Sequence, residues 1–451
     1  MQSSLSDEKV TLVGAGLAGS LLAIFLAKRG LHVEVYERRP DLRQVTDSAG
    51  RSINLAMSTR GLHALEQVGL AEEIKHCAIP MRGRMIHTLD GALHFQPYGK
   101  DDSEVLYAIA RTELNQKLLQ AAEHEHGVHL VFQQRCLGVN CSTGELHLRD
   151  EATGAERLLP CSRVIGTDGS ASAVRVSMLS TPRFNFVQAY LEHGYKELTI
   201  PPGSDGTWQL EKNALHIWPR GTYMLIALPN VDGSFTCTLF LPFEGANSFA
   251  SLSSADTVLA FFQQQFPDAV PLIPHLAETF SAHPTGSLVT ITCAPWYIAD
   301  KVLLLGDAVH AIVPFYGQGM NCAFEDCTYL DACIEPYWPD WERIFQTFMQ
   351  QRKEHTDAIA EMAIAHYIEM RDRVADAKFL LQKQLELELE RRYPERFIPQ
   401  YAMVTFHRIP YAIARHKGVI QEAMLQELCA SIESLDEVDW EKADDLITQR
   451  L

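Results

Sequence analysis

Two acidic residues, Glu37 and Asp307, each follow a short apolar run of strand type. A buried strand that ends in a carboxylate suits a polyol hydroxyl, because hydrogen bonds to a charged acceptor are strong. After Asp307, Pro314 and two glycines lead into a helical segment that carries Glu325 and Asp326. The free N–H groups at such a helix start favour a negative charge. Gly-Asp is also common in plain turns, so this stretch needs support from elsewhere in the chain.

That support comes from the N-terminal segment, where the β-type run 10–13 precedes the pattern G-x-G-x-x-G. Gly14 allows the tight turn, Gly16 lets the backbone approach a pyrophosphate, and Gly19 lets the helix pack closely on the strand. Glu37 ends the next strand, eighteen residues after Gly19, where it can bind a ribose diol. Strand, helix, second strand and acid are in register, which predicts a dinucleotide site.

A third acidic turn, Asp168-Gly169, also follows an apolar run. Asp-Gly is common in hairpin turns, but here a helical segment with Arg175 comes next. Arg51 lies where a pyrophosphate would run, although a surface arginine is an equal alternative. The His-rich run 124–129 is interrupted by Gly127, so its imidazoles do not share a helix face and no metal site is predicted.

Composition limits the class of protein. The 451 residues are enough for two or three domains. A formal charge of −18 argues against a nucleic-acid partner, which needs a basic field. The ten cysteines form no C-x-x-C pair, no window reaches the roughly 18 apolar residues of a membrane helix, and the N-terminus is too polar for a signal peptide. We expect a cytoplasmic protein.

The order of segments predicts an α/β fold with an inserted sheet. Strand-like text at 81–87 and 93–98, separated by an Asp-Gly turn, forms a β excursion (79–103) from the nucleotide fold. Runs 214–219, 223–229 and 235–241 read as adjacent antiparallel strands. The expected helices are 58–68, 111–122, 255–266, 341–374, 377–393, 419–432 and 440–450, with an extended stretch at 397–411.

The three acid motifs together resemble the single-component class A flavin monooxygenases. The segments Glu-Arg-Arg-Pro (37–40), Arg-Gly-Arg (82–84), His-Ile-Trp-Pro (216–219) and Pro-Phe-Tyr-Gly-Gln-Gly-Met-Asn (314–321) are similar to the branch of that family that hydroxylates L-kynurenine. The similarity covers nearly the whole chain. It implies a Rossmann-like FAD-binding domain of the p-hydroxybenzoate-hydroxylase type, in two parts (1–180 and 284–375), an inserted antiparallel substrate domain (181–283) and a C-terminal helical cap (376–451).

The resemblance also implies the chemistry. FAD is held non-covalently, NADPH is a co-substrate that reduces it, and O2 adds to give a flavin C4a-hydroperoxide that converts L-kynurenine to 3-hydroxykynurenine. An aniline ring is electron-rich, so the protein need mainly position it and exclude water. No catalytic acid or base is expected, and oxygen transfer is placed near Pro314, Phe315, Tyr316, Gly317 and Gln318.

By position in the family's motifs, the implied cofactor contacts are Gly14, Gly16, Gly19, Glu37, Arg38, Arg111, Asp168, Asp307, Gly319, Met320 and Asn321. The implied substrate contacts are Arg84, Tyr98, His366, Glu369, Met370 and Tyr401, with Arg84, Tyr98 and Tyr401 on the α-carboxylate.

Two positions depart from the family pattern. Where the family usually has Asn, this chain has His366, and the ordinary pKa of an imidazole, about 6.5, predicts substrate binding that depends on pH. The chain also lacks the apolar C-terminal anchor of eukaryotic members, which points to a bacterial type without a membrane anchor. A homodimer is left open.

Four alternatives are weighed against this interpretation. A flavin-dependent halogenase typically has a Trp-x-Trp motif, which the sequence lacks. A nicotinamide dehydrogenase would leave the Gly-Asp stretch unexplained. A related hydroxylase of another amino-aromatic substrate, or a non-enzymatic nucleotide-fold protein that merely binds partners, remains open.

Overall fold

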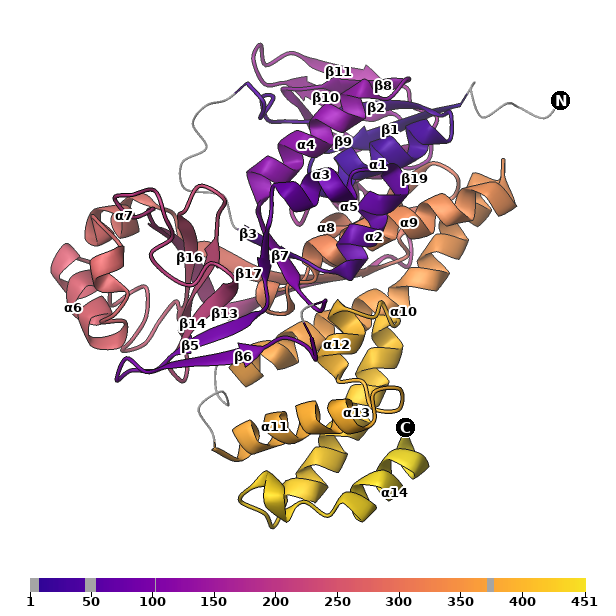
Figure 1. Cartoon of the computed structure of the whole chain (residues 1–451). Helices are drawn as coiled ribbons and strands as arrows, with labels where there is room; N and C mark the ends of the chain where they lie inside the picture. The colour runs from indigo at the N-terminus through magenta and orange to yellow at the C-terminus, as the bar shows by residue number, and fades with distance from the viewer. Residues whose placement is uncertain (1–7, 45–53, 102, 371–376) are drawn as a thin grey trace. The chain divides into compact units, whose positions relative to one another are not determined.

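The computed structural model describes residues 8–44, 54–101, 103–370 and 377–451. The chain divides into two units (Figure 1). Unit 1 comprises Met1–Cys77, Ala110–Tyr190 and Val289–Ala360, and unit 2 comprises Ala78–Ile109, Leu191–Leu288 and Glu361–Leu451. Arg51 lies outside the described residues.

Unit 1 is built on a mainly parallel sheet in the order β18-β19-β12-β1-β2-β8. Its strands are β1 (Lys9–Val13), β2 (His32–Tyr36), β8 (Val128–Val131), β12 (Val164–Gly166), β19 (Val302–Leu304) and the antiparallel β18 (Tyr297–Ile298). The strands that precede Glu37, Asp168 and Asp307 are therefore β2, β12 and β19. Because β1, β2, β12 and β19 are parallel, their carboxyl ends share one edge of the sheet, where such folds bind nucleotides.

Helices and a small sheet complete unit 1. The helices are α1 (Leu17–Lys28), α2 (Thr59–Val68), α3 (Ala71–His76), α4 (Arg111–His124), α5 (Ala173–Met178), α8 (Asp307–His310), η3 (Pro314–Tyr316), α9 (Gly319–Tyr337) and the start of α10 (Trp341–Ile368). The remaining strands are β3 (Asn54–Met57), β9 (Gln134–Val139), β10 (Leu146–Asp150) and β11 (Glu156–Leu159), of which the last three form an antiparallel sheet.

Unit 2 is organised around a seven-stranded sheet in the order β17-β13-β16-β15-β14-β5-β6. Its strands are β5 (Gly83–His87), β6 (Leu93–Pro97), β13 (Asn185–Ile200), β14 (Ala214–Pro219), β15 (Met224–Pro229), β16 (Phe235–Pro242) and β17 (Gly286–Ala294), and β4 (Ile79–Met81) pairs with β7 (Leu106–Ala110) separately. The expected antiparallel neighbours β14, β15 and β16 are confirmed. Helices α6 (Ala255–Gln265), η2 (Val270–Leu272) and α7 (Leu276–Ala282) pack on this sheet through a core that includes Phe235, Phe262 and Phe266.

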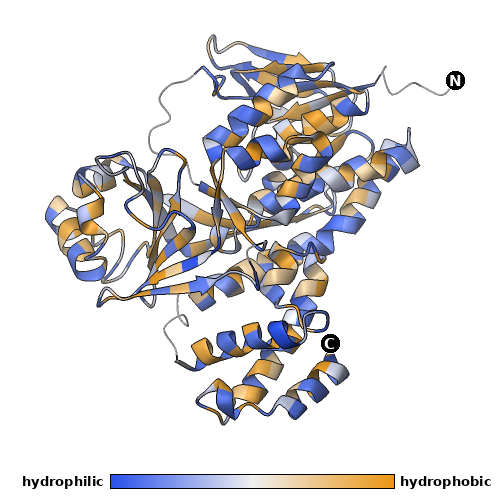
Figure 2. Ribbon diagram, viewed as in Figure 1, coloured by the Kyte–Doolittle hydropathy of each residue, from blue (hydrophilic) through white to orange (hydrophobic). Residues whose placement is uncertain are grey.

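The end of the chain is a group of helices that lie together in unit 2: α11 (Ala377–Arg392), α12 (Gln400–Thr405), α13 (Tyr411–Cys429), η5 (Leu435–Glu437) and α14 (Trp440–Arg450). Blue and orange residues alternate along them in Figure 2, as amphipathic helices require. Leu385, Leu389, Met424 and Ala443 are fully buried in their shared core.

Two expectations for this region are wrong. The stretch 397–411 is not extended, since it contains α12, and α13 begins at Tyr411 rather than near residue 419. Pro399 and Pro410 each immediately precede a first helical residue, a position where a missing N–H costs nothing. Gly418 lies inside α13 and does not end a helix. A Cβ there would lie 1.9 Å from Nε2 of Gln400, so the glycine allows α13 to pack closely against that side chain.

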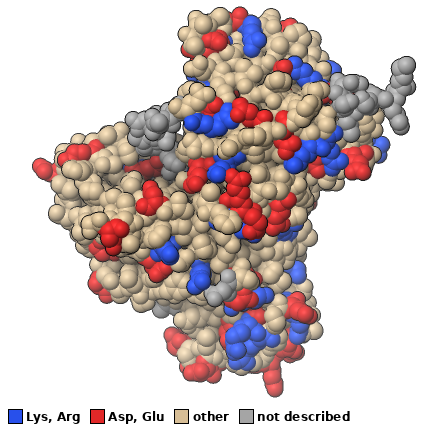
Figure 3. Space-filling model, turned by 45° about the horizontal axis from the view of Figure 1, so that its top comes forward, with Lys and Arg blue, Asp and Glu red and all other residues tan. Residues whose placement is uncertain are grey.

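Among the described residues, no helix combines the length and apolar character that crossing a membrane requires. On the face drawn in Figure 3, lysines and arginines are interspersed with acidic residues rather than gathered into a basic field. That face offers no continuous surface for a polyphosphate chain.

Candidate functional site

The glycine turn after β1 leaves open space at the start of α1. Gly14 has φ +103, and a Cβ there would lie 2.7 Å from the carbonyl oxygen of Thr167. A Cβ on Gly19 would lie 2.0 Å from the carbonyl oxygen of Gly14, so α1 packs closely on the turn. At Gly16 no atom of the described residues lies within 4 Å of a Cβ. The backbone N–H groups at the start of α1 are therefore open to a phosphate.

Glu37 is a buried, charged acceptor beside this turn. Its carboxylate accepts from the Ala15 N–H at 2.9 Å and from the backbone N–H and Nε of Arg39 at 2.9 and 2.8 Å. Burial opposes the charge, but Arg39 and the Ala15 N–H outweigh it and lower the pKa of Glu37. Arg38 and Arg111 are exposed, the latter as the first residue of α4.

Asp168 has one oxygen used by the protein and one left over. Oδ2 accepts from the backbone N–H groups of Ala173 and Val174 at 2.7 and 3.3 Å, which caps α5. Oδ1 is buried and has no hydrogen-bond partner among the described residues, and burial raises the pKa of this carboxyl. Arg175 donates to the carbonyls of Ser170 and Ala308 at 2.6 Å each, and so joins the Asp168 turn to the residue after Asp307.

The Gly306-Asp307 turn is followed by η3 and the start of α9. Asp307 is half-buried, and within the part of the chain that the structure describes its carboxylate receives no hydrogen bond. Gly319 and Met320 are partly exposed at the first turn of α9. Asn321, in contrast, donates to the carbonyls of Ala56 and Gly317 at 2.9 and 2.7 Å and accepts from the Ser58 N–H at 2.9 Å. Both amide protons of Asn321 are used within the protein, so its side chain mainly holds the loop in place.

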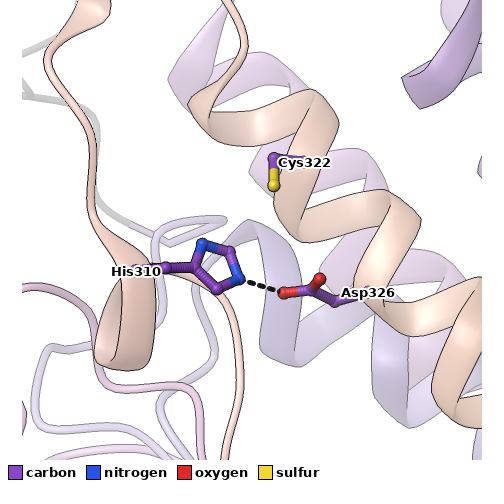
Figure 4. Close-up of side chains that lie close together, drawn as sticks. All are labelled: His310, Cys322 and Asp326. Atoms are coloured by element: carbon purple, nitrogen blue, oxygen red, sulfur yellow. Dashed lines mark hydrogen bonds and ion pairs between the residues drawn. The ribbon is translucent and has the colours of Figure 1, made fainter. Parts of the chain in front are cut away.

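A buried ionic cluster around Asp326 holds the Gly306-Asp307 turn in place. Asp326 accepts from Nε2 of His310 at 2.5 Å (Figure 4). It also accepts from the Gly306 N–H at 3.2 Å and from Nε of Arg352 at 2.8 Å. Cys322 points into the same space, and Nη2 of Arg352 lies 3.4 Å from its Sγ. Arg352 supplies the positive charge that a metal ion would bring, so the close approach of His310, Cys322 and Asp326 needs no metal ion.

The cluster extends to Glu325, which accepts from Arg60 and from Nη1 of Arg352, each at 2.7 Å. Burial opposes both carboxylates, but Arg352 with Arg60 lowers the pKa of Glu325, and His310 with Arg352 lowers that of Asp326. Breaking such a buried pair on one side typically costs 3–5 kcal/mol. Sequence reasoning placed the two acids on α9 but missed Arg60, His310 and Arg352, because their partners are distant along the chain.

The residues of unit 1 fit FAD. Open backbone N–H groups suit the pyrophosphate, Glu37 suits a ribose, and the Asp307 carboxylate is free for polyol hydroxyls. The unpartnered Oδ1 of Asp168 needs a donor, which a ligand hydroxyl can supply.

A second constellation lies within unit 2, around the half-buried side chain of Arg84 on β5. Its Nη2 lies 3.2 Å from Nε2 of His366 on α10, and its Cζ lies 5.5 and 5.1 Å from the ring centroids of Tyr98 and Tyr401. The two tyrosine rings are stacked, with centroids 5.8 Å apart. Nε of Arg84 is buried and has no hydrogen-bond partner among the described residues. The arginine therefore has a desolvated donor available for an anion.

The contact with Arg84 fixes the state of His366. Because arginine only donates, Nε2 of His366 must accept, so the imidazole is neutral and its proton is on Nδ1, 3.7 Å from Oε1 of Glu369. Burial, Arg84 and Lys383 hold the pKa of His366 well below its usual range. The expected titration of His366 near pH 6.5 is therefore wrong, since that value applies to an exposed imidazole without cations nearby.

The other side chains of this constellation differ in exposure. Tyr98 and Met370 are buried, while Tyr401 and Glu369 are half-buried. Burial raises the pKa of the Tyr98 hydroxyl. Lys383 of α11 lies 3.7 Å from Glu369, and no motif or spacing in the sequence indicates this neighbour. A guanidinium flanked by two aromatic rings and a neutral imidazole can bind a carboxylate attached to an apolar body.

Comparison with known proteins agrees with these features. A family model described as an FAD binding domain matches residues 7–190 and 288–360. The chain is 52% identical over 449 residues to a kynurenine 3-monooxygenase of Myxococcus xanthus, covering 100% of this chain and 97% of that protein. It is 48% identical over 435 residues to the protein of the same name from Flavobacterium psychrophilum, covering 96% of each. The solved structure of 2-methyl-3-hydroxypyridine-5-carboxylic acid oxygenase superposes with a TM-score of 0.67 at 20% identity, covering 83% of this chain and 95% of that one, which supports the fold.

Proposed function

The chain belongs to the kynurenine 3-monooxygenase family of FAD-dependent monooxygenases, and we propose from its own residues how it holds its cofactor and substrate. Enzymes of this family use FAD and NADPH and hydroxylate L-kynurenine. Bound FAD, once reduced by NADPH, supplies the activation of O2. The protein's own contribution is binding, orientation and exclusion of water.

The FAD site is assigned to the carboxyl edge of the unit 1 sheet. The N-terminus of α1 with Gly16 receives the pyrophosphate, and Glu37 accepts from a ribose hydroxyl. Asp307 accepts from the ribityl chain. Arg38 and Arg111 are exposed and free to meet phosphate, and the loop Pro314–Gln318 with Gly319 and Met320 lies beside the flavin ring.

The substrate site is assigned to the Arg84 pocket of unit 2. This assignment rests on Nε of Arg84, which is buried and has no hydrogen-bond partner among the described residues. The neighbouring Nη2 already donates to Nε2 of His366. A carboxylate that accepts from Nε relieves the cost of an unmet buried N–H, which is about 1–3 kcal/mol. The rings of Tyr98 and Tyr401 flank the guanidinium and offer flat surfaces to the short methylene–ketone arm that joins the amino-acid group of kynurenine to its ring.

This arrangement needs no proton donor or acceptor among the pocket residues. His366 is neutral, the hydroxyl pKa of Tyr98 is raised, and the electron-rich aminophenyl ring of kynurenine is itself the nucleophile. The residues therefore act by orientation, which alone can supply several kcal/mol of rate enhancement.

The test is direct. Purified protein should be yellow, and kynurenine should accelerate its NADPH oxidation with one 3-hydroxykynurenine formed per NADPH consumed. A colourless protein that fails to take up added FAD would refute the cofactor assignment. Flavin-bound protein that oxidises NADPH without making the product, with and without kynurenine, would refute the substrate.

We also infer a reducing compartment, because all ten cysteines are free thiols. Non-reducing and reducing electrophoresis of protein from its native cells should give the same mobility.

A further inference from the structure

A cluster of three ligand-type side chains lies in unit 2 apart from both sites described above. Glu104 comes from the loop before β7, Glu390 from α11 and His407 from the loop after α12. One carboxylate oxygen of each glutamate and one imidazole nitrogen all lie within 4.8 Å of one another. Oε1 of Glu104 is 3.1 Å from Nε2 of His407. Two carboxylates and one imidazole therefore converge on one point.

The charges in this cluster do not balance. Glu104 accepts from the Lys100 N–H at 3.0 Å, and its Oε1 lies 3.9 Å from the Lys100 Nζ. Glu390 is only 2% exposed, and the part of the chain that the structure describes offers its carboxylate no hydrogen bond or ion pair. Burial, with repulsion from Glu104, raises the pKa of Glu390 to about 7. Lys100 offsets this rise only in part, and among the described residues it forms its ion pair with Glu104 and not with Glu390.

The surroundings hold the two glutamates in place. A Cβ on Gly99 would lie 2.0 Å from Oε2 of Glu104, so the backbone at this glycine packs directly against the carboxylate. Glu390 lies in the last turn of α11, whose Leu385 and Leu389 are fully buried in the C-terminal core. The ligand atoms are thus fixed by backbone and core packing rather than by flexible surface chains.

We propose that Glu104, Glu390 and His407 bind one divalent transition-metal ion such as Mn²⁺ or Zn²⁺. Carboxylate oxygen with imidazole nitrogen is a donor set that suits these ions, whereas Mg²⁺ and Ca²⁺ prefer oxygen alone. The His407 side chain is 29% exposed, which provides an entry path and room for water to complete the coordination. The ion joins α11 and the loop after α12 to the loop before β7. This role is structural and does not depend on the function proposed above.

The joined segments also carry the stacked tyrosines. Tyr98 precedes Glu104 by six residues, and Tyr401 precedes His407 by six. An ion at the cluster braces both segments. It should raise the thermal stability of the full chain whether or not the flavin is bound.

The experiment titrates chelator-treated, full-length protein with Mn²⁺, followed by electron paramagnetic resonance, and measures the melting temperature with Mn²⁺, Zn²⁺ and Mg²⁺. We expect one Mn²⁺ per chain and a higher melting temperature with Mn²⁺ or Zn²⁺ than with Mg²⁺. Glu390→Gln and His407→Asn should each weaken Mn²⁺ binding by at least about tenfold. His147→Asn is the matched control, since His147 meets Glu156 at 2.8 Å on an exposed strand pair without a third ligand.

Absence of stoichiometric Mn²⁺ binding to wild-type protein would overturn the proposal, and a shared proton would then be the partner of Glu390. Binding that persists unchanged in both variants would overturn it as well. If Glu390→Gln does not fold, Mn²⁺ binding by His407→Asn and the Mn²⁺ stoichiometry of the wild-type protein still test the proposal, because the His407 side chain is partly exposed.

Discussion

The protonation state of His366 leads to a sharp prediction about pH. Its Nε2 lies 3.2 Å from Nη2 of Arg84, and Lys383 is a second cation near it. Two unit charges about 4 Å apart repel by roughly 4 kcal/mol at an effective dielectric constant of about 20. That penalty, added to burial, keeps the imidazole neutral, although Glu369 lies 3.7 Å from Nδ1. We therefore expect the Kd for kynurenine to change by less than about twofold between pH 6 and 8.5.

The alternative predicts a very different size of effect. An imidazolium within hydrogen-bond reach of a bound carboxylate would add roughly 4 kcal/mol of attraction, several hundredfold in Kd. The assay is the change of flavin absorbance on titration with kynurenine at several pH values, for wild type and His366→Asn. Both profiles should be flat and should coincide in shape. A wild-type profile that tightens below a midpoint in this range, together with a flat profile for His366→Asn, would refute the neutral assignment.

The other predictions concern separate parts of the chain. Arg84→Met should raise the kynurenine KM by ten- to a hundredfold, on the order of 1.4–2.7 kcal/mol, with flavin content unchanged; loss of flavin would instead make Arg84 a structural residue. Asp307→Ala should weaken FAD retention by at least tenfold, since a hydrogen bond to a charged group contributes roughly 1.5–3 kcal/mol; equilibrium dialysis giving wild-type retention would remove that assignment. His216 has its pKa lowered to about 4, by burial first and then by His87. Because the folded-state pKa lies below the unfolded value of about 6.5, its stabilisation is complete above pH 6.5 and is lost as the pH falls towards 4, by on the order of 3 kcal/mol. Urea unfolding at pH 7.5, 6 and 5 should show this loss, and an equally steep loss in His216→Gln would contradict it.

Two side chains of the His-Ile-Trp-Pro strand, His216 and Trp218, belong to a hydrogen-bonded network with residues outside the motif. Nδ1 of His216 lies 2.8 Å from Nε2 of His87, and Nδ1 of His87 lies 2.7 Å from Oδ2 of Asp268. Trp218 donates from Nε1 to the same oxygen of Asp268 at 2.9 Å. The sequence alone marked this segment through family resemblance. Its physical role, a buried polar chain within unit 2, depends on Asp268, a residue fifty positions away from Trp218.

Local signals in the sequence were sufficient where chemistry depends on local backbone geometry. The glycine turn, the strand ends with Glu37, Asp168 and Asp307, and the antiparallel order of β14 to β16 follow from spacing and alternation. The α/β fold and the FAD-binding class are confirmed. The helix starts at Gln400 and Tyr411 differ from the expected extended stretch at 397–411, because a proline immediately before a first helical residue is a start signal.

Long-range pairing explains most of what spacing could not predict. Arg352 meets Asp326 and Glu325 across 26 and 27 residues, and Arg84 meets His366 across 282. No periodicity links such positions, and a pKa that depends on burial and on a distant arginine cannot be assigned from residue type alone. The position of His366 was identified by resemblance, yet its titration was misjudged for this reason.

Buried charge separates the structural groups from the ligand-binding groups in this chain. Asp326 and Glu325 are buried, but Arg60, His310 and Arg352 meet their oxygens, so the cluster needs nothing from outside. Arg84 keeps one buried N–H unmet, and Asp168 keeps one buried oxygen unmet. An unmet buried polar group costs free energy that only a ligand, water or ion can recover. Glu390 is also buried, and it carries the opposite charge from Arg84, which is why a cation, rather than another substrate group, is assigned to it.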